Sequence, residues 1–282
     1  MTTPLWKRHL DQLRLENMAE LFAVDRPVIG MVHCWPMPGA PGYDGSYGVE
    51  TIVERAIDDA RALAAGGCHG MIVENMWDIP FRAGSDIPPE SVAAHAVVAR
   101  AVGDAVDLPM GINLVHNGGT ALLAVAIAAG ASFVRVCMFT GAGVWDGGQW
   151  DEGCAAELLR RRAELHATHI KLLADVDKKH SVRFPGIDLQ THIEWTRFFG
   201  ADGLIVSGRM TGDAPDLDKV REAKALAGDR PVILGSGTDE GNIGAFLQVA
   251  DGVIVGSSVK VDGEVANPVD PERVRRFVEA AG

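Results

Sequence analysis

The segment Gly200-Ala201-Asp202-Gly203-Leu204-Ile205-Val206-Ser207 decides the fold, because its pattern recurs along the chain. A turn of small residues leads into a short β-branched run, and the run ends at a polar residue or a glycine. The same order occurs at 67–74 and 250–256, and in a weaker form at 130–136. Glycine commonly ends a helix, and an uninterrupted apolar run is typical of a parallel strand buried on both faces. The pattern therefore predicts repeated helix-to-strand units.

Four further apolar runs, at 27–33, 108–114, 169–175 and 230–234, bring the expected strands to eight. Helical patterns lie between the strands, at 51–65, 89–106, 154–166, 189–199, 217–227 and 242–249. Strict alternation of this kind predicts an α/β protein with a single (β/α)₈ TIM barrel. An open doubly wound sheet is the alternative, but no G-x-G-x-x-G motif follows an early strand. We expect an N-terminal helical extension over residues 1–24 and the barrel over 25–282.

Composition narrows the class of partner. The chain has 26 Lys and Arg against 38 Asp and Glu, a net charge of −12. A net-acidic chain without a basic block is a poor binder of nucleic acid or of an anionic membrane. The four cysteines form no C-x-x-C pair, and the longest apolar stretch is about half of the ~20 residues that span a membrane. We expect a cytoplasmic protein without nucleic-acid or membrane partners; the sequence leaves open whether it forms a homo-oligomer.

The loops after the last two expected strands carry the most specific signal. In a TIM barrel the active site lies at the carboxyl ends of the strands, often with a phosphate site after strands seven and eight. Glycines let backbone N–H groups approach a phosphate closely, and we expect helices to begin near Asp239 and Ser257. The alternative is that these residues only make tight turns. The predicted phosphate-binding residues are Gly208, Gly235, Ser236, Gly237, Gly256, Ser257 and Ser258.

Other polar residues end the remaining strands and are candidates for acid–base catalysis or for polarising a reacting oxygen. They are Glu74, Asn113, Arg135, Asp175 and His180. A buried arginine must be paired or bind an anion, so Arg135 could instead pair with Glu74 or Asp175. Glu74, Asp175 and Asp177 could together hold a divalent cation, although the sequence requires no cofactor. The charges around Lys179 favour a solvated loop.

Three further loops are expected at the rim of the barrel mouth. The segment 36–47 combines prolines with glycines, as an ordered lid would. The segments 141–148 and 209–215 carry aromatic and polar residues that could cover a small polar ligand.

From about residue 20 onward the chain resembles the BtpA/SgcQ family. The likeness rests on the segments 27–33, 72–75, 133–136, 175–176, 179–181, 211–212, 215–217, 235–237 and 251–260. The resemblance implies a ribulose-phosphate-binding type of barrel, a family association with photosystem I biogenesis, and added weight for Lys179 and His180. One departure follows the third strand, where this chain reads His116-Asn117-Gly118-Gly119 and family members tend to have an Arg-Asn-Asp-like turn.

Two functions remain from the sequence. The first is an enzyme of sugar metabolism that acts on a small phosphorylated metabolite, by lyase, isomerase or glycosidic chemistry. The second is a non-catalytic factor that assembles a membrane complex, for which the apolar residues Leu10, Leu13 and Leu21 of the N-terminal extension are the candidate surface. The fold class favours the enzyme by analogy.

Overall fold

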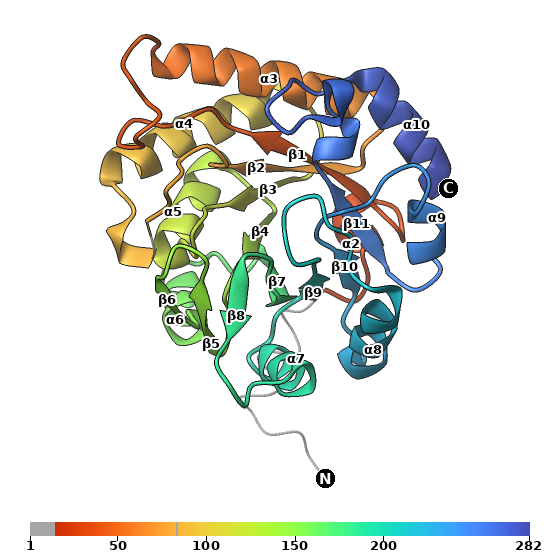
Figure 1. Ribbon diagram of the computed structural model, residues 1–282. Coiled ribbons are helices and arrows are strands. Elements are labelled where there is room, and N and C mark those ends of the chain that lie inside the picture. The colour runs from red at the N-terminus through yellow and green to blue at the C-terminus, as the bar shows by residue number, and fades with distance from the viewer. Residues whose placement is uncertain (1–14, 83) are drawn as a thin grey trace.

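The computed structural model describes residues 15–82 and 84–282 and contains a closed barrel of eight parallel strands (Figure 1). The predicted TIM barrel is confirmed. Around the barrel the order is β1, β11, β10, β9, β7, β4, β3 and β2, and β2 closes it onto β1. The strands are β1 (Val28–His33), β2 (Gly70–Glu74), β3 (Met110–Asn113), β4 (Phe133–Val136), β7 (Lys171–Asp177), β9 (Gly203–Val206), β10 (Val232–Leu234) and β11 (Gly252–Val255).

The helices surround the strands, as Figure 1 shows. They are α3 (Val49–Ala65), α4 (Pro89–Ala105), α5 (Gly119–Ala129), α6 (Ala155–Glu164), α7 (Leu189–Phe198), α8 (Leu217–Ala227), α9 (Ile243–Phe246) and α10 (Pro271–Ala281). Asp188, Asp216 and Asp270 cap α7, α8 and α10, because their carboxylates accept backbone N–H groups of the first turn. Among the described residues no helix is long and apolar enough to cross a membrane.

The helix expected over 242–249 is only four residues long and begins at Ile243. Asp239 Oδ1 accepts the amides of Gly241 and Asn242, so the chain first makes a side-chain-stabilised turn. At Ser257 the expected short helix is a single 3₁₀ turn, η2 (Ser257–Val259).

The barrel strands separate two apolar clusters. One cluster lies between the strands and the helices. The other fills the barrel interior with one or two residues from most strands, namely Ile29, Met31, Ile72, Phe133, Leu173, Ile205, Ile233 and Ile254. Such alternation follows from the pleat, because successive side chains of a strand point to opposite faces. The part of the barrel interior toward the amino-terminal ends of the strands, called the lower barrel below, is therefore a packed core.

Residues 15–22 close the amino-terminal end of the barrel. Leu15, Met18 and Phe22 belong to the interior cluster, and the ring of Phe22 meets that of Phe133 edge-on at 5.4 Å. The Leu15 N–H donates to Asp202 Oδ1 over 2.9 Å. Within the expected extension the described part holds one short helix, α2 (Ala19–Phe22), and residues 1–14 lie outside the described residues.

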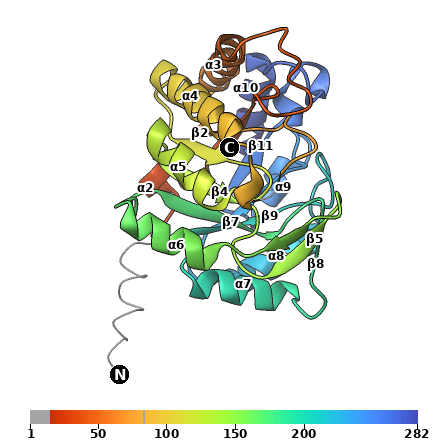
Figure 2. The ribbon, with the colours of Figure 1, turned by 90° about the vertical axis from the view of Figure 1, so that its left-hand side faces the viewer.

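A small antiparallel sheet lies outside the barrel, on the side opposite α2 (Figure 2). It consists of β5 (Ala142–Trp145), β6 (Trp150–Glu152) and β8 (Ser181–Arg183), with β5 in the centre. The segment 141–148, expected as a loop, therefore contains a strand and the turn of a hairpin. Its polar and glycine-rich composition does not distinguish a short exposed hairpin from a loop.

Candidate functional site

The pleat that packs the lower barrel also places polar groups above it. Two residues beyond Ile72, Phe133 and Leu173 on the same faces of their strands come Glu74, Arg135 and Asp175. All three are buried; Glu74 ends β2, Arg135 is the last residue but one of β4, and Asp175 lies two residues before the end of β7. Because both layers lie on the same face of each strand, the apolar layer inside the barrel is followed directly by a polar layer at its open end.

A cavity of about 270 Å³ opens above β10 and β11. Its walls include the two glycine and serine loops that were expected to bind phosphate. Five backbone N–H groups of these loops have no hydrogen-bond partner among the described residues, those of Ser236, Gly237, Thr238, Ser257 and Ser258. Unpaired N–H donors at the wall of a cavity are the groups that bind an anion.

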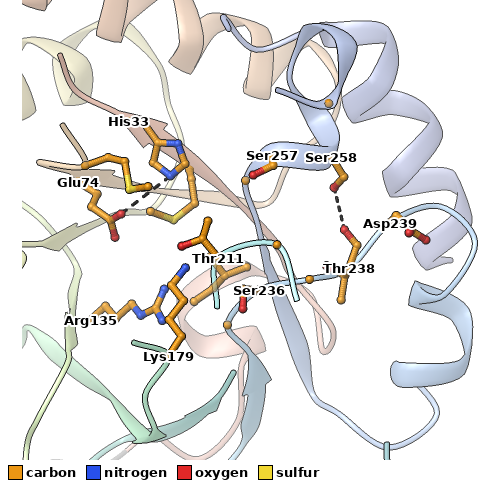
Figure 3. Close-up of a pocket in the computed structure, with 18 residues that line it drawn as sticks. His33, Glu74, Arg135, Lys179, Thr211, Ser236, Thr238, Asp239, Ser257 and Ser258 are labelled. Atoms are coloured by element: carbon orange, nitrogen blue, oxygen red, sulfur yellow. Dashed lines mark hydrogen bonds and ion pairs between the residues drawn. The ribbon is translucent and has the colours of Figure 1, made fainter. Parts of the chain in front are cut away.

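Side-chain and backbone contacts hold the two loops in place. The Ser258 hydroxyl donates to the Thr238 carbonyl over 2.8 Å and so ties the loops together (Figure 3). Gly237 has a φ of +76°, and a Cβ there would collide with the backbone of Asp213. Gly208 also packs against the Asp213 carbonyl, and it does not line the cavity. Gly208 thus packs behind the loops that line the cavity.

The contribution expected from helix dipoles is smaller than the sequence suggests. Both helices after these loops are single turns, and α9 starts four residues beyond Asp239. A macrodipole grows from aligned peptide groups, so the loop amides themselves are the main donors.

Glu74 faces the cavity from the opposite side, together with Arg135 and Lys179 (Figure 3). The Asn113 side-chain amide donates to Glu74 Oε2, and His33 Nε2 lies 3.9 Å from Glu74 Oε1. Burial lowers the pKa of His33, and the charges of Lys260, Lys179 and Arg135 lower it further. His33 is therefore a neutral neighbour of the carboxylate, and Asn113 orients that carboxylate.

Arg135 pairs with Asp175, which settles the alternatives left by the sequence. The Arg135 Nε and one terminal nitrogen lie 2.9 and 2.8 Å from the two Asp175 oxygens, a bidentate pair. Burial alone would lower the pKa of Arg135, but the charge and hydrogen bonds of Asp175 outweigh it and raise that pKa. The guanidinium is charged and lines the cavity.

The expectation that Asp175 projects into the mouth as an acid or a base is corrected by its burial. Its side chain is fully buried and lines neither the cavity above β10 and β11 nor a second cavity that adjoins it, and the Ser207 hydroxyl also approaches it at 3.5 Å. Strand β7 continues two residues beyond the predicted end, so Asp175 lies inside the strand. Its role is to position Arg135.

Lys179 is a functional candidate that the charged-loop interpretation missed. Its amine lines the cavity and has no hydrogen-bond or ion-pair partner among the described residues. Burial lowers the pKa of Lys179, as does the charge of Arg135, while Glu74 and Asp175 act in the opposite direction. The sequence offered one signal, the family resemblance, which gave added weight to Lys179 and His180; these residues follow β7 by two and three positions.

His180 lies in a second cavity that adjoins the first. Its Nδ1 is 2.9 Å from Asp146 Oδ2, and its Nε2 accepts the Thr211 N–H at 3.3 Å. Since an amide N–H can only donate, Nδ1 carries the proton that bonds to Asp146. Both ring nitrogens are used, so His180 connects three loops of the mouth.

The candidate metal ligands do not assemble. Asp177 interacts with Lys219 and lies 3.8 Å from Arg183, whereas Asp175 is occupied by Arg135. Across residues 15–82 and 84–282 no group of three or more His, Cys, Asp or Glu side chains is arranged to hold a metal ion.

The unusual turn at His116 serves the scaffold. His116 is fully buried, with Nε2 2.8 Å from Asp151 Oδ2. The Asn117 amide donates to the Glu152 carbonyl, and its oxygen accepts the Met138 N–H. Residues 116–119 line neither cavity.

Comparison with known proteins places the chain in a family. Residues 24–282 match the model of the BtpA family. The photosystem I biogenesis protein BtpA of Synechocystis sp. (strain ATCC 27184 / PCC 6803 / Kazusa) is 41% identical over 265 residues, 94% of this chain and 91% of that protein. An uncharacterized protein of Pyrococcus abyssi (strain GE5 / Orsay) is 39% identical over 90% of this chain and 95% of its own length.

Solved structures share the fold at low sequence identity. Tryptophan synthase of Mycobacterium tuberculosis has a TM-score of 0.60 at 16% identity, covering 96% of this chain and 97% of that one. N-(5'-phosphoribosyl)anthranilate isomerase of Pyrococcus furiosus has a TM-score of 0.56 at 14% identity, covering 91% and 98%. These likenesses show a TIM barrel similar to those of enzymes. By the extent of the family match and its sequence relatives, the chain belongs to the BtpA family.

Proposed function

We propose that this protein is an enzyme acting on a small phosphorylated, sugar-like metabolite. The observation that carries the proposal is the set of five unpaired N–H groups in the loops after β10 and β11, with two cationic side chains, Arg135 and Lys179, across the same cavity. A phosphate ester bound there would provide acceptors for amides that have none among the described residues. The fold supports this interpretation. One structural neighbour is N-(5'-phosphoribosyl)anthranilate isomerase of P. furiosus, and its name indicates a phosphorylated sugar compound as substrate.

The residues opposite the loops supply acid–base chemistry. Glu74 is the carboxylate that lines the cavity, and Asn113 fixes its orientation, so we assign it the proton transfer. Arg135, held by Asp175, and Lys179 would stabilise negative charge on the reacting oxygen. This arrangement suits isomerisation, aldol-type cleavage or cleavage of a glycosidic bond.

Calorimetric titration with ribose 5-phosphate and with ribose tests the phosphate site. The phosphorylated sugar should bind, and ribose should not. Ser257→Asp places a carboxylate beside the phosphate and should weaken binding at least about tenfold, because juxtaposed like charges cost several kcal/mol. Thr168→Asp, at the opposite end of the barrel, is the control for the added charge and should bind normally. Equal affinity in all three proteins would contradict the proposed site.

Solvent exchange tests the proton transfer. Ribulose 5-phosphate in D₂O should take up deuterium beside its carbonyl when incubated with the protein, as followed by NMR. Glu74→Gln keeps the size of the side chain and its contact with Asn113, and should lower the exchange rate by at least about a hundredfold. Binding without exchange in the unaltered protein would argue against Glu74 as the base.

A second function, assembly of a membrane complex, is favoured by the name of the 41%-identical Synechocystis relative. Within the N-terminal segment, however, Leu15, Met18 and Phe22 are already buried in the barrel, and Leu21 packs against them. A membrane surface would have to come from other residues. Flotation of the intact chain and of a chain lacking residues 1–14 with anionic vesicles tests this function, which predicts that only the intact chain floats.

A further inference from the structure

The second cavity shares a wall with the phosphate cavity. It has a volume of about 420 Å³, and Glu74, Met76, Arg135, Lys179 and Thr211 line both. The groups assigned to the chemistry therefore stand between two compartments. A ligand whose phosphate lies on the loops after β10 and β11 would extend past these groups into the second compartment.

The second compartment differs from the first in its chemistry. Carbon-rich side chains form most of its wall, those of Met76, Ile79, Pro80, Phe81, Val115, Cys137 and Trp145. Ile79 is 50% exposed at this wall. Apolar surface left open within a concave site is typical of a site for the apolar part of a ligand.

Contacts with neighbouring side chains hold Trp145 in one position. The centre of its ring lies 3.5 Å from the centre of the His116 ring and 5.8 Å from that of the Phe81 ring, and both pairs meet edge-on. Lys178 Nζ lies 4.0 Å from the centre of the Trp145 ring and 3.2 Å from Asp151, which also pairs with His116. The turn of 116–119 thus acts on the site indirectly, by supporting an aromatic wall.

The polar groups of the compartment lie around its apolar wall and limit the occupant. The Gln149 amide donates to the Phe81 carbonyl and fixes that segment, and Asp146, Lys178 and His180 add charge and hydrogen-bonding capacity. An apolar cavity of ~150 Å³ accepts benzene, so this compartment has room for one or two rings. Its aromatic walls suit the face or the edge of a flat ring.

We propose that the ligand is a phosphate ester whose other end is a flat, largely apolar aromatic or heteroaromatic ring, which lies against the wall formed by Phe81, Ile79 and Trp145. The proposal rests on the proposed function, because it takes the phosphate to lie on the loops after β10 and β11. The sugar-like portion then spans Glu74, Arg135 and Lys179, where the reacting bond would lie. This assignment adds a class of substrate, phosphorylated sugars that carry an aromatic group.

The test compares three synthetic ligands by calorimetry on the intact protein. They are ribose 5-phosphate, phenyl riboside 5-phosphate and phenyl riboside without phosphate. Burying a phenyl ring at about 25 cal/mol per Å² predicts that the second compound binds at least about tenfold tighter than the first. The third should bind much more weakly than the second.

Substitutions in the wall localise the effect. Phe81→Ala should remove most of the advantage of the phenyl compound, and Ile79→Ala should reduce it about threefold, while ribose 5-phosphate binds each variant as it binds the unaltered protein. Ile127 is also exposed, at 40%, but lies on α5 outside both cavities. Ile127→Ala is therefore the matched control for Ile79→Ala and should change neither affinity.

The outcomes separate this inference from the function on which it rests. If ribose 5-phosphate binds and the phenyl group adds nothing, the second compartment does not hold a ring and the phosphate site stands. If the phenyl riboside binds equally with and without phosphate, the proposed function fails. An advantage that survives Phe81→Ala unchanged would overturn the assignment of the compartment.

Discussion

The two ends of the barrel interior are built on the same strand faces and have opposite character. At the lower end, Ile72, Phe133 and Leu173 pack against one another and under residues 15–22. Two residues farther along the same strands, Glu74 and Arg135 line an open cavity, and Asp175 is buried against Arg135. One end is closed by the chain itself, and the other is left for a ligand.

This difference assigns stability to the closed end of the barrel and ligand binding to the open end. Filling an interior with apolar side chains stabilises a fold, whereas burying a charge costs free energy unless the charge is paired. In this barrel Asp175 pairs with Arg135, and Lys179 has no such partner among the described residues. The unpaired cation at the open end is what we expect of a binding site, and changes at the two ends should have different consequences.

Removing a large side chain at the closed end should have the largest effect on stability. Phe133 is fully buried, lies over Gly111 and meets Phe22 edge-on. Phe133→Ala should lower the free energy of unfolding by about 3–5 kcal/mol, measured by urea denaturation. Ribose 5-phosphate should still bind the folded variant with unchanged affinity. A loss of affinity with little loss of stability would contradict the separation of the two ends.

Removing the partner of Arg135 should affect both properties. Asp175→Ala leaves a buried guanidinium without its carboxylate and should cost about 3 kcal/mol of unfolding free energy. Affinity for ribose 5-phosphate should also fall, because the guanidinium loses its fixed position. The isosteric variant Asp175→Asn keeps one acceptor oxygen and should lie between the two. Equal stability of all three proteins would mean that the pair contributes nothing to the fold.

Replacing His33, which lies above the apolar layer, by an apolar residue should have a smaller effect on stability, and this effect should depend on pH. The pKa of His33 lies well below its ordinary 6.5 in the folded protein, so on acidification the unfolded chain takes up a proton that the folded chain does not. The contribution of the neutral His33 to the free energy of unfolding is therefore present above pH 6.5 and is lost as the pH falls below it. His33→Met should lose about 1.4 kcal/mol less than the unaltered protein between pH 7.5 and pH 5.5. Parallel stability curves would show that His33 does not titrate differently in the two states.

The barrel was predictable because its evidence is local. Each strand is a short apolar run, several follow a helix-ending glycine, and the parallel closure follows from strict alternation. The loops at Ser236 and Ser257 could be assigned to one place for the same reason, since the carboxyl ends of adjacent parallel strands meet. The predicted position of those loops depends only on the order of strands and helices along the chain.

The rest depends on three-dimensional packing that sequence spacing does not contain. Whether Arg135 would pair with Glu74 or with Asp175 was decided by side-chain geometry between β4 and β7. The apolar compartment draws on Phe81, Trp145 and Lys178 from segments far apart in the chain. Lys179 looked like a solvated charge because a sequence does not show that its amine faces a cavity.

A crystal structure of the protein with ribose 5-phosphate would show directly whether the loops after β10 and β11 bind phosphate. We expect the phosphate within hydrogen-bonding distance of the backbone amides of Ser236, Gly237 and Ser257, with the sugar directed toward Glu74 and Lys179. A phosphate bound elsewhere, or a cavity that excludes the ligand at saturating concentration, would contradict it.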